Sequence, residues 1–406
     1  MRKLKVGIIG GGIGGVALAA SLKSRGIESH IFERAPAFGE VGAGIQMTPN
    51  AVKIMRALGI FESLQKISFV PQNIIGRNWK TAREMWRTPL AEDCTRLYGA
   101  PFFHVHRADL HRILLERIDL GATTLGTACV DVGQNGNTAF ATFADGREFE
   151  ADVIIGADGI HSTVRKSLFG DEPARFTGNM CWRAVVPFDK PPFDYVTPDS
   201  SFWLGPNGHV VTYYVSGGAA VNIVAVLETK DWVQESWNAS SSREELLAGY
   251  KGWHENLQKL FSRADNVFKW GLFDRDPMPT WTKGRLTLLG DAAHPMLPFL
   301  SQGAAMAIED GFVLSGALSD TADIPEALIR YESLRRPRTT RVQLESRERG
   351  RTYHLTSKFA QIKRDLGYRW KSLVNPQSSG LGANWVYEYD AAAQLRDTLS
   401  LSQAAE

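Results

Sequence analysis

Two residues with acid–base chemistry lie four positions apart in a run that is typical of a strand. His209 and Tyr213 belong to the segment 209–215, which is rich in valine and tyrosine. Residues at such a spacing share one face of a strand, so we expect the two side chains to point the same way. A histidine beside a tyrosine can take a phenolic proton near neutral pH, and the pair therefore predicts a general base. A sheet histidine that merely packs on a tyrosine is the alternative that the sequence leaves open.

The clearest cofactor signal lies near the start of the chain, where residues 4–33 have the pattern strand, glycine turn, helix, strand and acid. Gly10, Gly12 and Gly15 have the G-x-G-x-x-G spacing. The first glycine permits a sharp turn, the second lets a pyrophosphate approach the backbone, and the third allows close packing of helix on sheet. Glu33 ends the second strand about 20 residues on, where its carboxylate can accept hydrogen bonds from a ribose. The pattern predicts a dinucleotide site at a helix N-terminus.

The same stretch has two other interpretations. An isolated G-x-G-x-x-G is a weak signal, because glycine-rich turns are common. The basic residues 1–5 and the uncharged run 6–22 also have the order of a secretory signal. However, the glycines in this run would weaken the helix of such a signal, and the run is too short and too rich in glycine for a membrane span. We therefore expect a dinucleotide site and no export.

The composition is that of an ordinary globular protein with more than one domain. The 406 residues exceed the size at which single cores usually divide. With 44% apolar residues, 22% charged residues and a net charge of +2, there is no case for binding to nucleic acid or a membrane. Cys94, Cys129 and Cys181 are too few and too scattered for a disulfide framework or a zinc site. We expect no metal and a cytoplasmic location.

The order of elements predicts an α/β fold of discontinuous domains. A Rossmann-like nucleotide-binding domain is expected to comprise residues 1–75, 100–175 and 276–330. Strand-like runs between turns predict an inserted antiparallel β-sheet substrate domain, comprising residues 76–99 and 176–275. The remaining residues, 331–406, are expected to form a helical C-terminal region. Its many Arg and Lys residues at 335–372 are expected to form a solvated helix face.

Three separated motifs together resemble a known family. They are G-x-G-x-x-G with Glu33, G-A-D-G-I-x-S-x-V-R at 156–165 and G-R-L-x-L-L-G-D-A-A-H-P at 284–295. In this order they resemble the single-component FAD-dependent aromatic hydroxylases, the para-hydroxybenzoate hydroxylase superfamily. The resemblance covers nearly the whole chain. The stretches 41–46 and 385–389 look like those of salicylate hydroxylases, 3-hydroxybenzoate 6-hydroxylases and 6-hydroxynicotinate 3-monooxygenases.

The resemblance implies an FAD site built from these motifs. The glycine turn would hold the FAD pyrophosphate, Glu33 the adenosine ribose, and Arg107 a phosphate or ribose. Asp158 would shape the site shared with the nicotinamide donor, and Asp291 would bind the ribityl chain. The helix that begins near Gln302 would direct its dipole at the reduced flavin. The expected cofactor-binding residues are Gly10, Gly12, Ile13, Gly14, Gly15, Glu33, Arg34, Gly44, Gln46, Arg107, Asp158, Asp291, Pro295, Gly303 and Ala304.

The resemblance also implies an activity. NADH or NADPH would reduce FAD, and the reduced flavin would take O2 to a C4a-hydroperoxide that hydroxylates an activated ring. The substrate would be a small phenolic or hydroxylated heteroaromatic acid. The chain has no second nucleotide-binding motif, which matches a nicotinamide donor that binds transiently. The expected partners are thus a small aromatic substrate, no nucleic acid and no membrane, and the chain is expected to be a monomer or a homodimer.

Several assignments stay open. His209 is the expected base, with Tyr213 beside it and Gln302 able to position the substrate or the peroxide. His294 is the rival base, because it adjoins Asp291 in sequence, although we favour it as a residue of the flavin loop. Arg183 is a weak candidate for a clamp on a substrate carboxylate. An FAD-dependent tailoring hydroxylase of a larger natural product, or a flavin- or NAD-binding oxidoreductase without monooxygenation, are the alternative functions.

Overall fold

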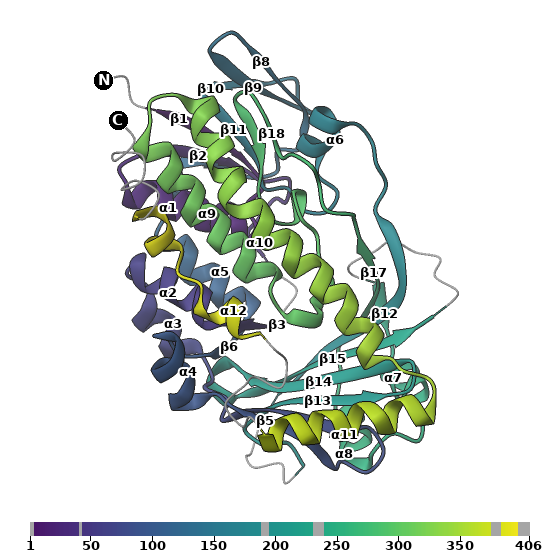
Figure 1. Ribbon diagram of the computed structural model, residues 1–406. Coiled ribbons are helices and arrows are strands. Elements are labelled where there is room, and N and C mark those ends of the chain that lie inside the picture. The colour runs from purple at the N-terminus through teal and green to yellow at the C-terminus, as the bar shows by residue number, and fades with distance from the viewer. Residues whose placement is uncertain (1–3, 40–42, 188–194, 230–238, 375–382, 397–406) are drawn as a thin grey trace.

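The computed structural model describes residues 4–39, 43–187, 195–229, 239–374 and 383–396. The molecule is elongated, with a parallel sheet and its helices at one end and a broad, largely antiparallel sheet at the other (Figure 1). The long helix α10 (Ile324–Tyr353) runs beside both parts. The predicted α/β class, with a nucleotide-binding sheet, a second sheet and C-terminal helices, is therefore confirmed.

The parallel sheet places the glycine motif at its carboxyl edge. β1 (Lys5–Ile9) pairs in parallel with β2 (Glu28–Phe32) on one side and with β11 (Val153–Gly156) on the other. Because the chain leaves β1 in both directions, the carboxyl end of β1 is a switch point, the place where open α/β sheets bind ligands. The full order is β18 (Thr282–Lys283), β19 (Leu286–Leu288), β11, β1, β2 and β7 (Thr123–Thr124), with β18–β19 as the antiparallel pair.

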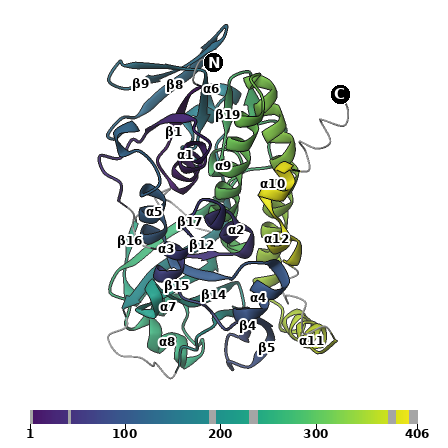
Figure 2. The same cartoon turned by 90° about the vertical axis from the view of Figure 1, so that its left-hand side faces the viewer.

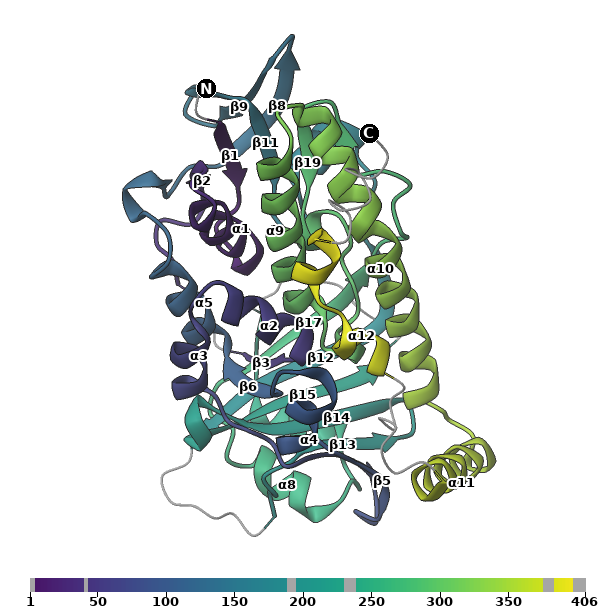
Figure 3. The ribbon, with the colours of Figure 1, turned by 60° about the vertical axis from the view of Figure 1, so that its left-hand side comes forward.

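A tight turn joins β1 to α1 (Ile13–Ser24). Gly10 has a φ angle of +108°, and a Cβ on Gly15 would lie 2.0 Å from the carbonyl oxygen of Gly10, so both positions require glycine. α1 packs on α9 (Gly303–Asp320), and α9 lies between α1 and α10 (Figure 3). A Cβ on Gly311 of α9 would lie 2.8 Å from the backbone nitrogen of Leu18, so this glycine permits the close approach of the two helices.

A smaller antiparallel sheet packs beside the parallel one. It consists of β8 (Cys129–Asn135), β9 (Thr138–Phe143) and β10 (Glu148–Ala151). The β9–β10 hairpin turns at Asp145-Gly146, as the sequence predicts. Helix α6 (Thr163–Phe169) follows β11.

The second large sheet forms the floor of the cavity described below. Its order is β16 (Ala239–Ser241), β17 (Val267–Asp274), β12 (Arg175–Pro187), β15 (Ala220–Glu228), β14 (Gly208–Val215), β13 (Ser200–Gly205), β4 (Asn73–Asn78) and β5 (Glu84–Pro89). All pairs except β13–β4 are antiparallel. The strands expected in this region are confirmed, and β5 lies within the segment 76–99 that was assigned to this sheet. The exact domain limits stay a prediction, although β4 runs across the expected limit at residue 75.

Shorter elements connect and cover the sheets (Figures 1 and 2). On one side are β3 (Gly44–Met47), β6 (Phe103–His106), α2 (Pro49–Ala57), α3 (Phe61–Ile67), α4 (Ala91–Tyr98) and α5 (Arg107–Leu115). Around the large sheet are α7 (Arg243–Gly249), α8 (Glu255–Phe261), α11 (Lys358–Val374) and α12 (Asn384–Glu388). The 3₁₀ turns η3 (Gly290–Ala292) and η4 (Pro298–Leu300) lie between β19 and α9, and η1 (Leu120–Ala122) and η2 (Ser216–Gly218) lie in other loops.

A buried ion network joins α9 to α10. Arg335 of α10 is fully buried, and its guanidinium contacts Glu309 at 2.6 Å and Asp310 at 2.7 Å. Arg338 adds a contact of 2.9 Å to Glu309. Burial alone would raise the pKa of the Glu309 carboxyl, but Arg338 and Arg335 outweigh it and hold the pKa below its ordinary value. This carboxylate therefore stabilises the fold above its unfolded pKa, and its contribution is lost as the pH falls through the folded pKa.

The network corrects one expectation about the basic C-terminal region. Arg351 and Lys371 are exposed, as predicted for a solvated face, and Arg336 is half-buried. For Arg335 and Arg364, which are buried, the prediction is wrong. The physical reason is that the acidic partners of Arg335 lie on a different helix, so the composition of the basic segment alone could not reveal them.

None of the described helices combines the length and the apolar character that a membrane crossing needs. Among the same residues there is no cluster of histidine, cysteine and carboxylate side chains that could hold a metal ion.

The network yields a stability prediction. Arg335→Met should lower the free energy of unfolding by about 3–5 kcal/mol, because it leaves two buried carboxylates without their shared cation. Arg351→Met is the matched control: Arg351 is exposed on the same helix and pairs with Glu348, so its loss should cost less than about 1 kcal/mol. Urea denaturation of the two variants measures the difference, and equal small losses would contradict the assigned role of the network.

Candidate active site

One cavity of about 340 Å³ lies between the carboxyl edge of the parallel sheet and the face of the large sheet. The loops that follow β1, β11 and β19 all line it, through Gly12, Ala157 and Asp291. The other wall is the face of β12, β14 and β15 that carries Arg183 and His209. Segments far apart in the sequence therefore meet around one cavity, as expected for a ligand at a switch point.

Many of the predicted residues line this cavity and several do not. Those that line it are Gly12, Ile13, Gly14, Gly44, Gln46, Arg107, His209, Tyr213, Asp291, Gly303 and Ala304. Those that do not line it are Gly10, Gly15, Glu33, Arg34, Asp158, Pro295 and Gln302. Residues 41 and 42 of the stretch 41–46 lie outside the described residues.

The end of the cavity beside the parallel sheet, its upper part, has the open space and the polarity that a dinucleotide needs. A Cβ built on Gly12 or on Gly303 meets no protein atom within 4 Å, so both backbones face open space. These glycines stand at the N-termini of α1 and α9, and neither helix has an acidic residue in its first turn. Two helix N-termini with free N–H groups that face one cavity can bind phosphate and stabilise a negatively charged ring. The residues present therefore fit FAD.

Two of the predicted polar residues, Glu33 and Asp158, are held by hydrogen bonds to their own surroundings. Glu33 accepts hydrogen bonds from the backbone nitrogens of Gly11 at 2.7 Å and Ala35 at 2.9 Å. Asp158 accepts from the Ser162 hydroxyl and from the backbone nitrogen of Val164 at 3.2 Å, so it orients the start of α6. A carboxylate has further lone pairs, so the roles of Glu33 and Asp158 towards ribose or nicotinamide stay predictions.

Gln302 and His294 belong to buried polar clusters. The Gln302 amide oxygen accepts from Asn50 at 3.2 Å, and its amide nitrogen donates to the Thr48 hydroxyl at 3.2 Å. His294 Nε2 lies 2.6 Å from Asp310 and the ring is 1% exposed. Neither side chain lines the cavity. The geometry thus favours His209 over His294 as the base, in keeping with the assignment of His294 to the loop. A direct catalytic role of Gln302 stays a prediction.

The lower part of the cavity brings His209, Tyr213 and Arg183 onto one sheet face. The predicted strand is β14, and both His209 and Tyr213 line the cavity from it. Val224 of β15 pairs with Val211 of β14 and with Arg183 of β12. The side chains of Arg183, Val224 and Val211 therefore lie in a row across the sheet. The Arg183 guanidinium lies 5.1 Å from the Trp270 ring centre, and its Nε has no hydrogen-bond partner among the described residues.

Burial sets the protonation of this part of the site. It holds the pKa of His209 well below its usual value, and the nearby His354 lowers the pKa further. Burial also raises the pKa of Tyr213 far above its usual range. At neutral pH His209 is therefore a neutral proton acceptor, and Tyr213 is a protonated hydroxyl that can donate a hydrogen bond.

One residue in contact with the expected base was missed by sequence reasoning. His354 Nε2 lies 2.7 Å from Nδ1 of His209, although the two histidines are 145 positions apart. His354 follows the last turn of α10 and carries no local motif, so no pattern in the sequence points to it.

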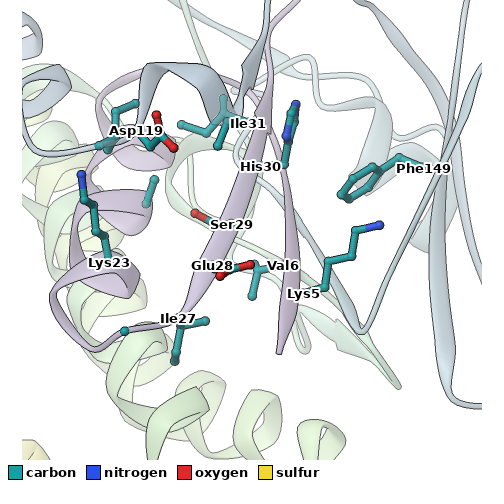
Figure 4. A pocket seen from close by; sticks show the side chains of 14 residues that line it. Lys5, Val6, Lys23, Ile27, Glu28, Ser29, His30, Ile31, Asp119 and Phe149 are labelled. Carbon is teal, nitrogen blue, oxygen red and sulfur yellow. The ribbon is translucent and has the colours of Figure 1, made fainter. Parts of the chain in front are cut away.

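A second cavity, of about 460 Å³, is lined by residues of α1, β1, β2 and β10 (Figure 4). Its walls carry Lys5, Glu28, His30 and Phe149. None of the predicted site residues lines it.

Comparisons with known proteins define the class. Residues 3–346 match the model of the FAD binding domain family, so the chain belongs to this family. It is an FAD-dependent aromatic monooxygenase, with NAD(P)H and O2 as co-substrates, as the resemblance implies.

Three individual proteins that are similar to the chain have more specific names. The chain is 41% identical over 390 residues to a 3-amino-4-hydroxybenzoate 2-monooxygenase of Streptomyces platensis, with 96% of each chain covered. It is 36% identical over 348 residues to a 6-hydroxynicotinate 3-monooxygenase of Pseudomonas fluorescens, with 84% and 89% covered. A solved salicylate hydroxylase substrate complex has a TM-score of 0.81 at 29% identity, with 97% of each chain covered.

The open space above Gly12 yields a prediction about the cofactor. Gly12→Val should abolish FAD retention, because the new side chain would occupy the space expected for the pyrophosphate. The fold should persist, since the backbone of Gly12 is extended and no protein atom is near. The ratio of flavin to protein after purification measures the effect, with Gly367→Val on exposed α11 as the control. Full flavin content in Gly12→Val would refute this placement.

Proposed function

We propose that this protein hydroxylates a small aromatic carboxylic acid with an ionisable ring hydroxyl, and that 3-amino-4-hydroxybenzoate is the first candidate. The observation that carries the proposal is the placement of Arg183, His209 and Tyr213 on one face of the same cavity. An arginine with an unpartnered Nε suits a carboxylate, and a neutral histidine suits a ring hydroxyl. The named relatives act on 3-amino-4-hydroxybenzoate, 6-hydroxynicotinate and 3-hydroxybenzoate, which all carry both groups.

The cofactor in this proposal lies at the upper end of the cavity. Gly12, Arg107 and Asp291 line this end. Gly12 and the start of α1 would hold the phosphates, and Asp291 would bind the ribityl chain. The N-terminus of α9, at Gly303, faces the ring system. Bound FAD, once reduced by NAD(P)H, supplies the oxygen-activating chemistry.

The side chains of this protein supply binding and proton transfer. Arg183 orients the carboxylate, and the hydroxyl of Tyr213 donates a hydrogen bond to the ring oxygen. His209 takes the proton of that oxygen, which raises the electron density of the ring and makes it a better nucleophile. Val211, Val224 and other apolar side chains of the sheet face keep water away from the reacting atoms. A cytoplasmic location and a monomeric or homodimeric state remain part of this proposal.

A substrate panel tests the proposal. Holoenzyme with NADH or NADPH should convert 3-amino-4-hydroxybenzoate to a hydroxylated product that carries one atom of isotope-labelled O2. 2-Aminophenol lacks only the carboxylate and 3-aminobenzoate lacks only the hydroxyl, so both should be much poorer substrates. Products are identified by mass, because NADH can be consumed without hydroxylation. Absence of product from every hydroxylated acid in the panel, including 6-hydroxynicotinate and 3-hydroxybenzoate, would overturn the proposal.

The carboxylate contact has its own prediction. Arg183→Gln should raise KM for the acid about 10- to 100-fold, the value of one charge-assisted hydrogen bond, and should leave KM for 2-aminophenol unchanged. Arg77→Gln is the matched control, since Arg77 lies 5.8 Å from the centre of the Trp203 ring, outside the cavity. An equal rise of KM for both compounds would show that Arg183 does not bind the carboxylate.

A further inference from the structure

We propose that His354 and Glu228 form a proton path that connects His209, and thus the ring hydroxyl of the substrate, with the surface of the protein. The inference rests on the proposed function, because it names the route by which the proton of that hydroxyl leaves the cavity. His354 does not line the cavity, so it acts through His209 and not on the substrate itself.

The geometry consists of one hydrogen bond, between the two histidines, and one longer ion-pair contact, between His354 and Glu228. His209 Nδ1 and His354 Nε2 are 2.7 Å apart, a normal hydrogen-bond length, and the two rings are stacked with centres 5.0 Å apart. His354 Nδ1 lies 3.5 Å from Oε1 of Glu228. Both histidines are buried, whereas the side chain of Glu228, near the end of β15, is 47% exposed. The series His209, His354 and Glu228 therefore leads from the cavity to solvent.

A single arrangement of protons makes His209 ready to act. If Nε2 of His209 is to accept a proton from the substrate, its Nδ1 must carry a hydrogen, which it donates to Nε2 of His354. His354 then carries its own hydrogen on Nδ1, on the side of Glu228. The carboxylate thus selects the tautomer of His354, and His354 selects that of His209.

The transfer balances along this chain. The O–H bond of the ring hydroxyl breaks as the Nε2–H bond of His209 forms. The Nδ1–H bond of His209 breaks as the Nε2–H bond of His354 forms, and the Nδ1 proton of His354 passes to Glu228 and on to water. The path resets when a proton returns along it to the ring oxygen of the product.

The surroundings of His209 explain why such a path is needed. Tyr353 of α10 and Phe299 of η4 pack against its ring, and burial keeps Tyr353 neutral. Arg183 on β12 is a cation on the same sheet face. Asp291, on the loop after β19, is the one carboxylate among the described residues that line the cavity, and none of the rings packed on His209 supplies an anion for its imidazolium, so the proton is better passed on than held. Glu228 is the nearest carboxylate that the structure places on this chain.

The experiment measures ionisation of the ligand without turnover. Oxidised holoenzyme is mixed with 3-amino-4-hydroxybenzoate in weak buffer, and the ultraviolet change of the ring hydroxyl is followed together with a pH indicator. His354→Gln should slow ionisation and proton release about tenfold or more, because the amide can accept the hydrogen bond from His209 but cannot pass a proton on. The equilibrium Kd of the ligand should change less than about twofold, since the contacts that bind it remain. Glu228→Gln should slow the same two signals.

Two further variants separate a proton path from a structural role. His354→Ala leaves a space at the histidine, and added imidazole should restore rapid ionisation there but not in Glu228→Gln. His254→Gln is the matched control, because His254 packs on Trp203 outside the cavity, and it should behave like the wild type. Ionisation at the wild-type rate in His354→Gln, or slow ionisation of His354→Ala that imidazole does not restore, would overturn the path. If the wild-type protein binds none of the hydroxylated acids, the proposed function itself fails.

Discussion

The buried carboxylate of Asp310 connects the elements that form the expected cofactor side of the site. It accepts a hydrogen bond from the backbone nitrogen of Gly290 at 3.1 Å and contacts His294 at 2.6 Å, so it holds both ends of the turn that carries Asp291. Its other oxygen contacts Arg335 at 2.7 Å. One buried group of α9 thereby fixes the loop after β19, the helix that faces the cofactor and the long helix α10. A buried ion pair adds little net stability compared with apolar packing, but it admits few alternative arrangements.

The neighbouring Glu309 extends this constraint to α2. It accepts a hydrogen bond from Asn50 at 2.7 Å, and Asn50 also donates to Gln302, the residue before the first turn of α9. Buried polar contacts within the protein therefore hold the N-terminus of α9 in position without a ligand. Such preorganisation matters for electrostatic stabilisation, because a helix dipole that is already in place needs no rearrangement when charge develops.

A second constraint holds the two halves of the cavity together. The backbone nitrogen of Gly44 donates to Asn222 of the large sheet at 2.7 Å, and Gln46 donates to Ser200 at 3.0 Å. A Cβ on Gly44 would lie 2.6 Å from the ring of Tyr213. The loop that was expected to touch the cofactor therefore also packs directly on the proposed catalytic side chain, and glycine is required there for the close approach of these two parts.

What the sequence could reveal depended on how local each pattern is. The turn at Gly10–Gly15 and the shared face of His209 and Tyr213 follow from spacing within one element, and both are present as predicted. Arg335 looked like a surface residue, because its acidic partners lie in another helix. Those acids, Glu309 and Asp310, are adjacent charges in an otherwise apolar stretch. Because buried charges are paired, this pattern could have predicted a cationic partner from elsewhere in the sequence. His354 offered no signal of this kind, since only folding brings it to His209.

The proposed proton path also affects the electron density of the substrate ring. An imidazolium retained on His209 would sit beside the ionised ring oxygen, and two unit charges about 4 Å apart attract each other by about 4 kcal/mol at an effective dielectric constant of about 20. That attraction would lower the energy of the ring oxygen anion and reduce the electron density available to an electrophilic oxygen. When the proton moves on through His354 to Glu228, His209 becomes neutral again and the anion keeps its charge on the ring. A base that is buried and weak is therefore suited to this site, because it carries a proton away without remaining as a counterion.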